Sequence, residues 1–144
     1  MNSQDIDNWG KKGFCIVKDL LNKNLILDSN LYMNKMYKNK DLSVKDFGSD
    51  GKLEFPSNTL IDKIVVDENI INCVKKMLNT DNILLVQADA WGKEGKDDYS
   101  NYSNNNQRMH MDYGNNSFLH PSNWDEPECV AMIVYLSDIK KTGG

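Results

Sequence analysis

The feature that most constrains the fold of this chain is a change in its apolar pattern a little past the midpoint. Before that point apolar residues recur at helical spacing, so that Ile70, Val74 and Leu78 fall on one face of a helix. After it, apolar residues gather in short runs, at 83–91 and 129–136, which are typical of strands. Helices followed by strands predict an α+β fold.

Capping residues and breakers predict where the helices begin and end. Ser, Asp and Asn side chains accept hydrogen bonds from the first amides of a helix, and Gly often ends one. Residues 14–17 have the apolar character of a short strand, and 46–51 are polar and predict a loop. We expect a helix capped by Ser3 to run to about Lys12, where Gly13 ends it, and a helix capped by Asp19 to run to about Lys40. We also expect a shorter helix over 59–66 and a further helix that Asp67 caps.

Composition and charge describe an ordinary soluble protein. The 144 residues are 40% hydrophobic and 26% charged, which predicts one globular domain over 1–144. A net charge of -4 gives no basic face for nucleic acid. No signal peptide or membrane-spanning run is evident, so we expect a cytoplasmic protein that does not insert into a membrane. Three widely spaced cysteines, Cys15, Cys73 and Cys129, predict reduced and mostly buried thiols.

The candidate chemistry lies in one of only two histidines. His110 and Asp112 form an H-x-D motif, and side chains two residues apart on a strand point to the same side. A histidine and a carboxylate placed so can share a metal ion, as in the two-histidine, one-carboxylate sites of iron(II) oxygenases. The tripeptide alone is more often a surface hydrogen bond. Here it lies between two long polar segments, where binding residues gather.

The motif is followed by a proline-containing loop, an apolar strand and a Gly-Gly turn. The segments that carry this order are 108–115, His120-Pro121, Trp124, Pro127-Glu128, 133–138 and Gly143-Gly144. Together they resemble one branch of the phytanoyl-CoA dioxygenase family of 2-oxoglutarate-dependent iron(II) oxygenases. Residues 13–17 also resemble the family's N-terminal strand, although the specific part of the resemblance covers about 87–144.

The resemblance implies a double-stranded β-helix, a jelly-roll or cupin-like core with N-terminal helices against one face. By position, His110 and Asp112 would be the first two iron ligands and the catalytic residues. The family's third ligand, a histidine, and an arginine that holds 2-oxoglutarate come after the Gly-Gly turn, and no position here matches them. We therefore expect the chain to be an incomplete portion of an oxygenase, lacking the C-terminal part of the fold and inactive alone.

The resemblance also suggests a residue for the co-substrate. Gln87, on the strand before the H-x-D segment, is a candidate to hydrogen-bond a carboxylate of 2-oxoglutarate, because the family often places an amide or lysine there. Lys93 is the competing choice. A polar residue on the outer face of a strand is an equally good interpretation of Gln87.

The implied activity is hydroxylation of an unactivated C–H bond of a small organic substrate. Such an enzyme would use Fe(II) as cofactor and 2-oxoglutarate as co-substrate, with ascorbate as a candidate reductant. Related halogenases replace the carboxylate ligand with a small residue, so Asp112 favours hydroxylation.

Two other interpretations remain open. The first is a catalytically inactive binding or scaffold module of the same ancestry. The second is a zinc hydrolase that uses His110, Asp112 and His120, since such sites need three protein ligands.

Overall fold

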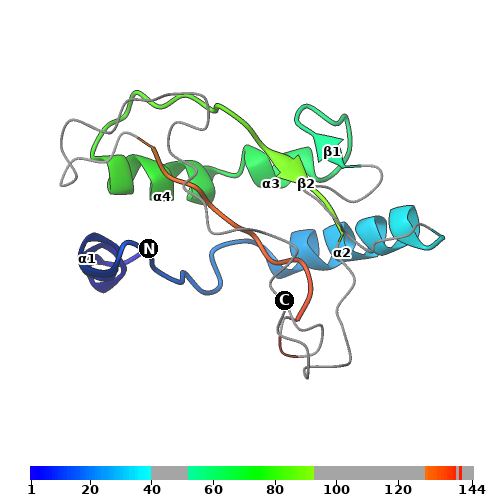
Figure 1. The fold of residues 1–144 in the computed structure, drawn as a ribbon, viewed down its shortest axis with the longest axis horizontal. Helices are drawn as coiled ribbons and strands as arrows, with labels where there is room; N and C mark the ends of the chain where they lie inside the picture. Colours follow the sequence, from blue (N-terminus) through cyan, green and yellow to red (C-terminus); the bar gives the residue numbers. More distant parts are fainter. Residues whose placement is uncertain (40–51, 93–128, 139, 141–144) are drawn as a thin grey trace, which may run out of the picture.

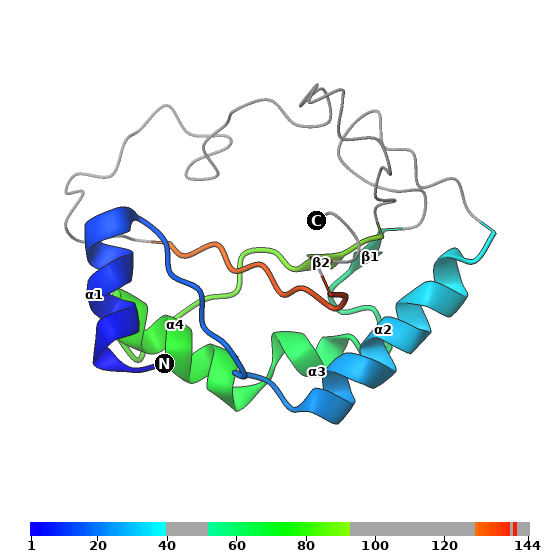
Figure 2. The same cartoon turned by 90° about the horizontal axis from the view of Figure 1, so that it is seen from below.

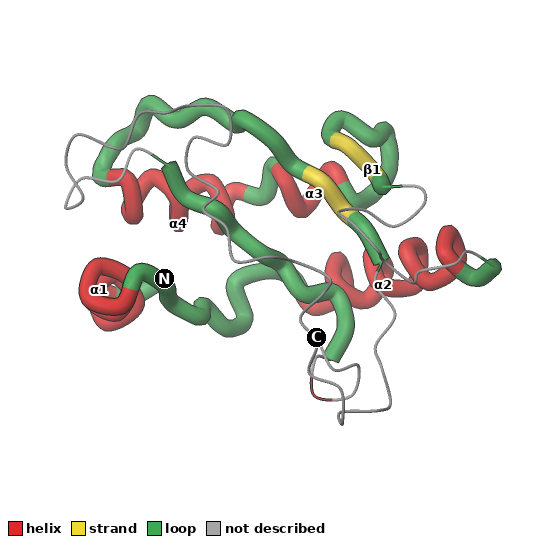
Figure 3. Tube along the Cα trace, in the orientation of Figure 1, coloured by secondary structure: helices red, strands yellow, loops and turns green. Residues whose placement is uncertain are grey.

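The computed structural model of the chain describes residues 1–39, 52–92, 129–138 and 140 (Figure 1). Within these residues most of the regular structure is helical, and the strands are short (Figure 3). In chain order the elements are α1 (Ser3–Lys12), α2 (Lys23–Tyr37), β1 (Leu53–Glu54), α3 (Asp62–Val65), α4 (Glu68–Leu78) and β2 (Asp89–Ala90).

Helix α1 begins and ends on side-chain and backbone caps that the sequence provides. Asn2 accepts a hydrogen bond from the Asp5 amide at 2.9 Å, and the Asp5 carboxylate accepts one from the Asn2 amide at 2.9 Å. Gly13 then adopts the left-handed conformation, with φ 76°, and donates to the Trp9 carbonyl. The predicted helix and its glycine stop are confirmed, but the N-cap is Asn2 rather than Ser3.

Helix α2 starts later than predicted. The Asn22 side chain accepts from the amides of Asn24 and Leu25, at 2.8 and 3.3 Å, and so caps the helix. The prediction of Asp19 as this cap is wrong, because Asp19 lies in the left-handed region, at φ 54°, outside the helix. The helix also ends at Tyr37, before the predicted end near Lys40.

Helices α3 and α4 follow one another with two capping residues between them, Val66 and Asp67. Asp67 accepts from the Asn69 amide at 2.8 Å and caps α4, as predicted. Helix α3 is shorter than the predicted 59–66, because the residues before it form a turn around Asp62. The Asp62 carboxylate accepts from the amide and hydroxyl of Ser57, at 3.0 and 2.6 Å, and from the Asn58 amide at 2.9 Å.

The two strands form a small antiparallel sheet in which Leu53 faces Ala90 and Glu54 faces Asp89. Strand β1 was not predicted, and it lies between two helices, so helices and strands are not strictly separated along the chain. Strand β2 covers only two residues of the predicted run 83–91, and 14–17 contain no assigned strand.

The second apolar run, 129–136, carries no strand assignment, but its burial alternates with a period of two. Val130, Met132, Val134 and Leu136 are partly buried, and the residues between them are exposed. This alternation is the pattern of an extended segment with one covered face. The double-stranded β-helix stays a prediction, because many of the residues expected to form it lie outside the described ranges.

The helices lie on one side of the extended segments. Figure 2 shows α1, α4, α3 and α2 as an arc, with residues 79–92 and 129–138 running across its open side in the same direction. The apolar core joins the two layers where α2 and the turn before α3 meet the sheet. Its buried residues are Met33, Tyr37 and Ile61, and Tyr32, Met36, Leu53, Ala90 and Leu136 pack against them.

Two predictions about the whole chain can be compared with the described part. Within it, no helix has both the length and the apolar character that crossing a bilayer requires. Cys73 is buried, Cys15 is half-buried and Cys129 is exposed. The prediction of mostly buried thiols is therefore confirmed for Cys73 and wrong for Cys129.

Candidate functional site

The candidate site lies on the β1–β2 sheet, because pairing of the strands brings residues 52–54 beside 87–89. The Phe55 amide donates to the Ala88 carbonyl at 2.9 Å and extends the pairing beyond the two-residue strands. Side chains of facing residues on such a pair lie close enough to interact. Four polar side chains from these two short segments therefore come together.

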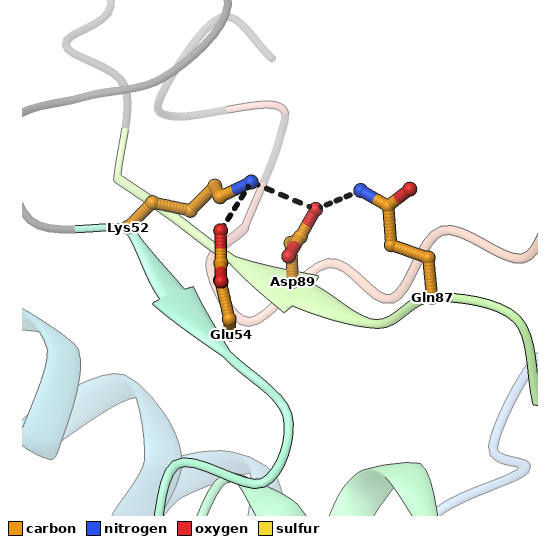
Figure 4. A network of polar contacts seen from close by, with 4 residues as sticks. All are labelled: Lys52, Glu54, Gln87 and Asp89. Carbon is orange, nitrogen blue, oxygen red and sulfur yellow. Dashed lines mark hydrogen bonds and ion pairs between the residues drawn. The ribbon is translucent and has the colours of Figure 1, made fainter. Parts of the chain in front are cut away.

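Lys52 is the positive centre of this group (Figure 4). Its Nζ lies 3.1 Å from Oε1 of Glu54 and 3.3 Å from Oδ2 of Asp89. Hydrogen bonds to Glu54 and then to Asp89 raise the pKa of the Lys52 ammonium above its ordinary value. Lys52 is therefore charged at neutral pH. The one ammonium group of Lys52 faces the two carboxylates of Glu54 and Asp89, so it neutralises only one of their two negative charges.

Gln87, the predicted co-substrate residue, belongs to the same group. Its Nε2 donates a short hydrogen bond to Oδ2 of Asp89, the oxygen that Lys52 also contacts. Figure 4 shows Lys52 and Gln87 approaching Asp89 from opposite sides. An amide nitrogen carries two N–H groups, so Gln87 retains one donor and its carbonyl oxygen for other partners.

A small open cavity of about 220 Å³ lies beside three of these residues, Glu54, Gln87 and Asp89. The residues around it carry amide, carboxylate and apolar side chains. Lining residues are Glu54, Phe55, Val86, Gln87, Ala88 and Asp89. A larger hollow of about 450 Å³ lies between the start of α1 and residues 16–18, but no predicted site residue lines it. We therefore take the smaller cavity as the candidate site.

The predicted metal ligands, His110 and Asp112, lie outside the described residues, and so do His120 and Lys93. In the part of the chain that the structure describes, no group of three or more histidine, cysteine, aspartate or glutamate side chains is placed to hold a metal ion. The structure thus places Gln87 and leaves the H-x-D motif as a feature of the sequence.

Sequence reasoning missed Lys52, Glu54 and Asp89. Lys52 and Asp89 are 37 positions apart, and only the pairing of two short strands brings them together. The alternation of charged residues around Leu53 was the one local signal of strand β1. A two-residue strand is too short for such a pattern to be recognised.

Comparisons with protein-family models, with curated proteins and with solved structures found no match for this chain.

Proposed function

We propose that this chain belongs to a 2-oxoglutarate-dependent Fe(II) dioxygenase that hydroxylates an unactivated C–H bond of a small organic substrate. The observation that carries the proposal is the H-x-D motif, His110 and Asp112, in a sequence context similar to that of the phytanoyl-CoA dioxygenase family. The proposal draws support from Gln87, which is one of the residues that line a cavity of about 220 Å³. The location in the cytoplasm remains part of the same proposal.

The side chains of His110 and Asp112 offer ligand atoms of the kinds that iron(II) sites use. An imidazole nitrogen and a carboxylate oxygen are two of the three protein ligands that such iron sites use. His110 and Asp112 would hold the ion, and bound iron with 2-oxoglutarate would supply the oxidising chemistry. The protein's part is to orient these ligands, to bind the co-substrate carboxylate near Gln87 and to exclude water from the substrate.

Metal binding by the purified chain is the first test. We expect Fe(II), or Mn(II) as a spectroscopic substitute, to bind weakly, because two protein ligands leave the ion mostly hydrated. His110→Ala and Asp112→Ala should each weaken that binding by at least about tenfold, since even loss of an outer-sphere partner costs this much. Electron paramagnetic resonance of free and bound Mn(II) measures the affinities.

His120→Ala is the matched control, because it removes the chain's other histidine. Unchanged Mn(II) affinity in His120→Ala supports the oxygenase. If His120→Ala weakens binding as much as His110→Ala does, a zinc site with three ligands replaces the proposal. If neither His110→Ala nor Asp112→Ala changes the affinity, the motif is no metal site, and an inactive binding module is the better description.

Turnover is the second test. Two ligands predict that the 144 residues release no succinate from 2-oxoglutarate when given Fe(II) and ascorbate. A longer polypeptide that supplies the third ligand and the arginine should release succinate in an amount that matches the hydroxylated product. Succinate release by the 144 residues alone would show that the assignment of an incomplete site is wrong.

A further inference from the structure

The extended segment after α1 exposes two large apolar side chains between two lysines. Phe14 and Ile16 are 61% and 74% exposed, whereas the residues at 15 and 17 are half-buried. Burial with a period of two puts Phe14 and Ile16 on the face of the segment that is open to solvent. Lys12 and Lys18 continue the same period at either end, and both are exposed.

Helix α2 repeats this arrangement at helical spacing. Leu27 and Leu31 lie about one turn apart and are 61% and 66% exposed. Lys23 lies one turn before Leu27 and Lys35 one turn after Leu31, and both are exposed. Residues four apart lie on the same face of a helix, so these side chains form one stripe. The stripe lies away from the buried residues of α2, which are Ser29, Met33 and Tyr37.

Both stripes lie on one side of the layer that α3 and α4 form. In Figure 1, residues 13–22 and α2 follow the lower edge of the molecule, and Figure 2 looks onto that edge. The buried side of α2 packs against Ile61, which directly precedes α3, so the exposed leucines point away from this layer. We call the two stripes together the lysine-bracketed face.

The lysine-bracketed face is basic on a protein that is acidic as a whole. Residues 1–39 hold six lysines and four aspartates, a net charge of +2, whereas the whole chain has a net charge of -4. Among the described residues, the lysines that form ion pairs are Lys52 and Lys75, and neither belongs to this face. The charge of the face is therefore available to a negatively charged partner.

We propose that the lysine-bracketed face binds a membrane surface that contains negatively charged lipids. The ammonium groups contact the anionic headgroups, and the apolar side chains between them enter the boundary between headgroups and acyl chains. Lysine suits this boundary, because its stem lies along apolar surface while its charged end stays in water. Bound in this way, the chain lies on the bilayer and does not cross it.

Two other occupants fit this face less well. A second copy of the chain would bring lysines against lysines, because each stripe carries them at both ends, and like charges placed together oppose binding. An acidic protein would balance the charge, but protein partners bind most strongly through apolar side chains clustered at the centre of an interface. Here lysines separate the apolar pairs. A lipid surface accepts such separate side chains, because it needs no matching pocket.

Sedimentation of the full chain with lipid vesicles tests the proposal. We expect binding to vesicles of mixed phosphatidylcholine and phosphatidylserine, weaker binding as the salt concentration rises, and little binding to phosphatidylcholine alone. Lys23→Gln combined with Lys35→Gln should weaken binding roughly thirtyfold, about fivefold for each lysine near an anionic surface. Leu27→Gln combined with Leu31→Gln should weaken it roughly tenfold, because these side chains no longer enter the boundary region.

Matched pairs elsewhere on the protein separate this face from charge and apolarity in general. Lys63→Gln combined with Lys76→Gln removes the same charge from exposed positions on α3 and α4. Leu84→Gln combined with Val86→Gln removes side chains that are 86% and 88% exposed, in the segment before β2. Neither pair should weaken binding as the variants of the face do. Circular dichroism checks that every variant keeps its helices.

Failure of the wild-type chain to bind phosphatidylserine vesicles overturns the proposal. Unchanged binding in either variant of the face, or an equal loss in the matched pairs, also overturns it. If soluble polyglutamate binds the chain through Lys23 and Lys35 while vesicles do not, an acidic protein partner replaces the lipid surface. His110→Ala should leave vesicle binding unchanged, so the result does not depend on the proposed oxygenase.

Discussion

The Sγ atom of Cys73 lies 3.1 Å from the Sδ atom of Met1, so the first residue of the chain packs against the buried face of α4. Cys73 is 2% exposed, and burial raises the pKa of its thiol. Burial also raises the pKa of Cys15, which is only half-buried, and Cys129 is exposed.

These environments predict an order of thiol reactivity. The thiolate is the reactive form, and a buried thiol reacts only when the structure opens locally. We expect alkylation by iodoacetamide to proceed fastest at Cys129, more slowly at Cys15, and at least about tenfold more slowly still at Cys73. Peptide mass spectrometry over time measures the rates. In guanidinium the three rates should converge, and a fast Cys73 in the native chain would contradict the contact with Met1.

The second prediction concerns Gly92, which lies against the ring of Tyr37. A Cβ atom added at Gly92 would come within 2.8 Å of Tyr37 Cδ2 and 3.0 Å of Cε2. Tyr37 is a buried core residue at the end of α2, so its ring has little room to move. We expect Gly92→Ala to lower the free energy of unfolding by about 1 to 3 kcal/mol, the usual cost of overpacking.

Gly10→Ala is the control for this substitution in chemical denaturation. Gly10 lies within α1 with nothing within 4 Å of an added Cβ. Alanine is favoured over glycine in helices, so Gly10→Ala should raise the free energy of unfolding by about 0.5 to 1 kcal/mol. Equal effects of the two substitutions would mean that Gly92 and Tyr37 are not in contact.

The third prediction concerns Ser29, which is fully buried on α2. Its hydroxyl has no hydrogen-bond partner within the part of the chain that the structure describes. An unsatisfied buried hydroxyl is costly, so Ser29→Ala should raise the free energy of unfolding by about 1 kcal/mol. Thermal unfolding followed by circular dichroism provides the measurement. Ser57→Ala should instead destabilise, because the Ser57 hydroxyl bonds to Asp62 and Thr59.

The fourth prediction concerns the pH dependence of the turn before α3. The hydrogen bond from the Ser57 hydroxyl, with those from backbone amides, lowers the pKa of Asp62 below 3.8, the ordinary value. A lowered pKa in the folded state means that the ionised carboxylate stabilises the fold. That contribution is complete above the ordinary carboxyl pKa and is lost as the pH falls through the lowered one.

Asp62→Asn removes this titration. The stability difference between wild type and Asp62→Asn should therefore be largest near neutral pH and should shrink between about pH 5 and pH 2. Urea unfolding at a series of pH values measures it. Asp67→Asn is a suitable comparison, because asparagine also caps helices well. A pH-independent difference for Asp62→Asn would mean that the Ser57–Asp62 hydrogen bonds do not form.

Helix positions could be predicted where one residue alone could serve as the cap. Asp67 directly precedes the apolar stripe of α4, and Gly13 follows α1, so both boundaries were correct. The start of α2 was predicted wrongly, because Asp19 and Asn22 are both residue types that cap helices well and the local sequence does not distinguish them. The packing of Met33 and Tyr37 in the core fixes the helix that forms.

The candidate site was predictable only in part. Gln87 was chosen by resemblance and lies beside a cavity, but its partners could not be foreseen. Lys52 comes from a strand of two residues, too short for a periodic pattern, and reaches Asp89 only through tertiary pairing. Local propensity carries no information about such pairing.

The contact between Met1 and Cys73 also bears on the order of events during folding. Met1 precedes α1, and its sulfur partner lies 72 positions away in the sequence. Contacts across such long stretches of chain form slowly. Met1 should therefore reach Cys73 only after helix α4 has formed from its own local contacts.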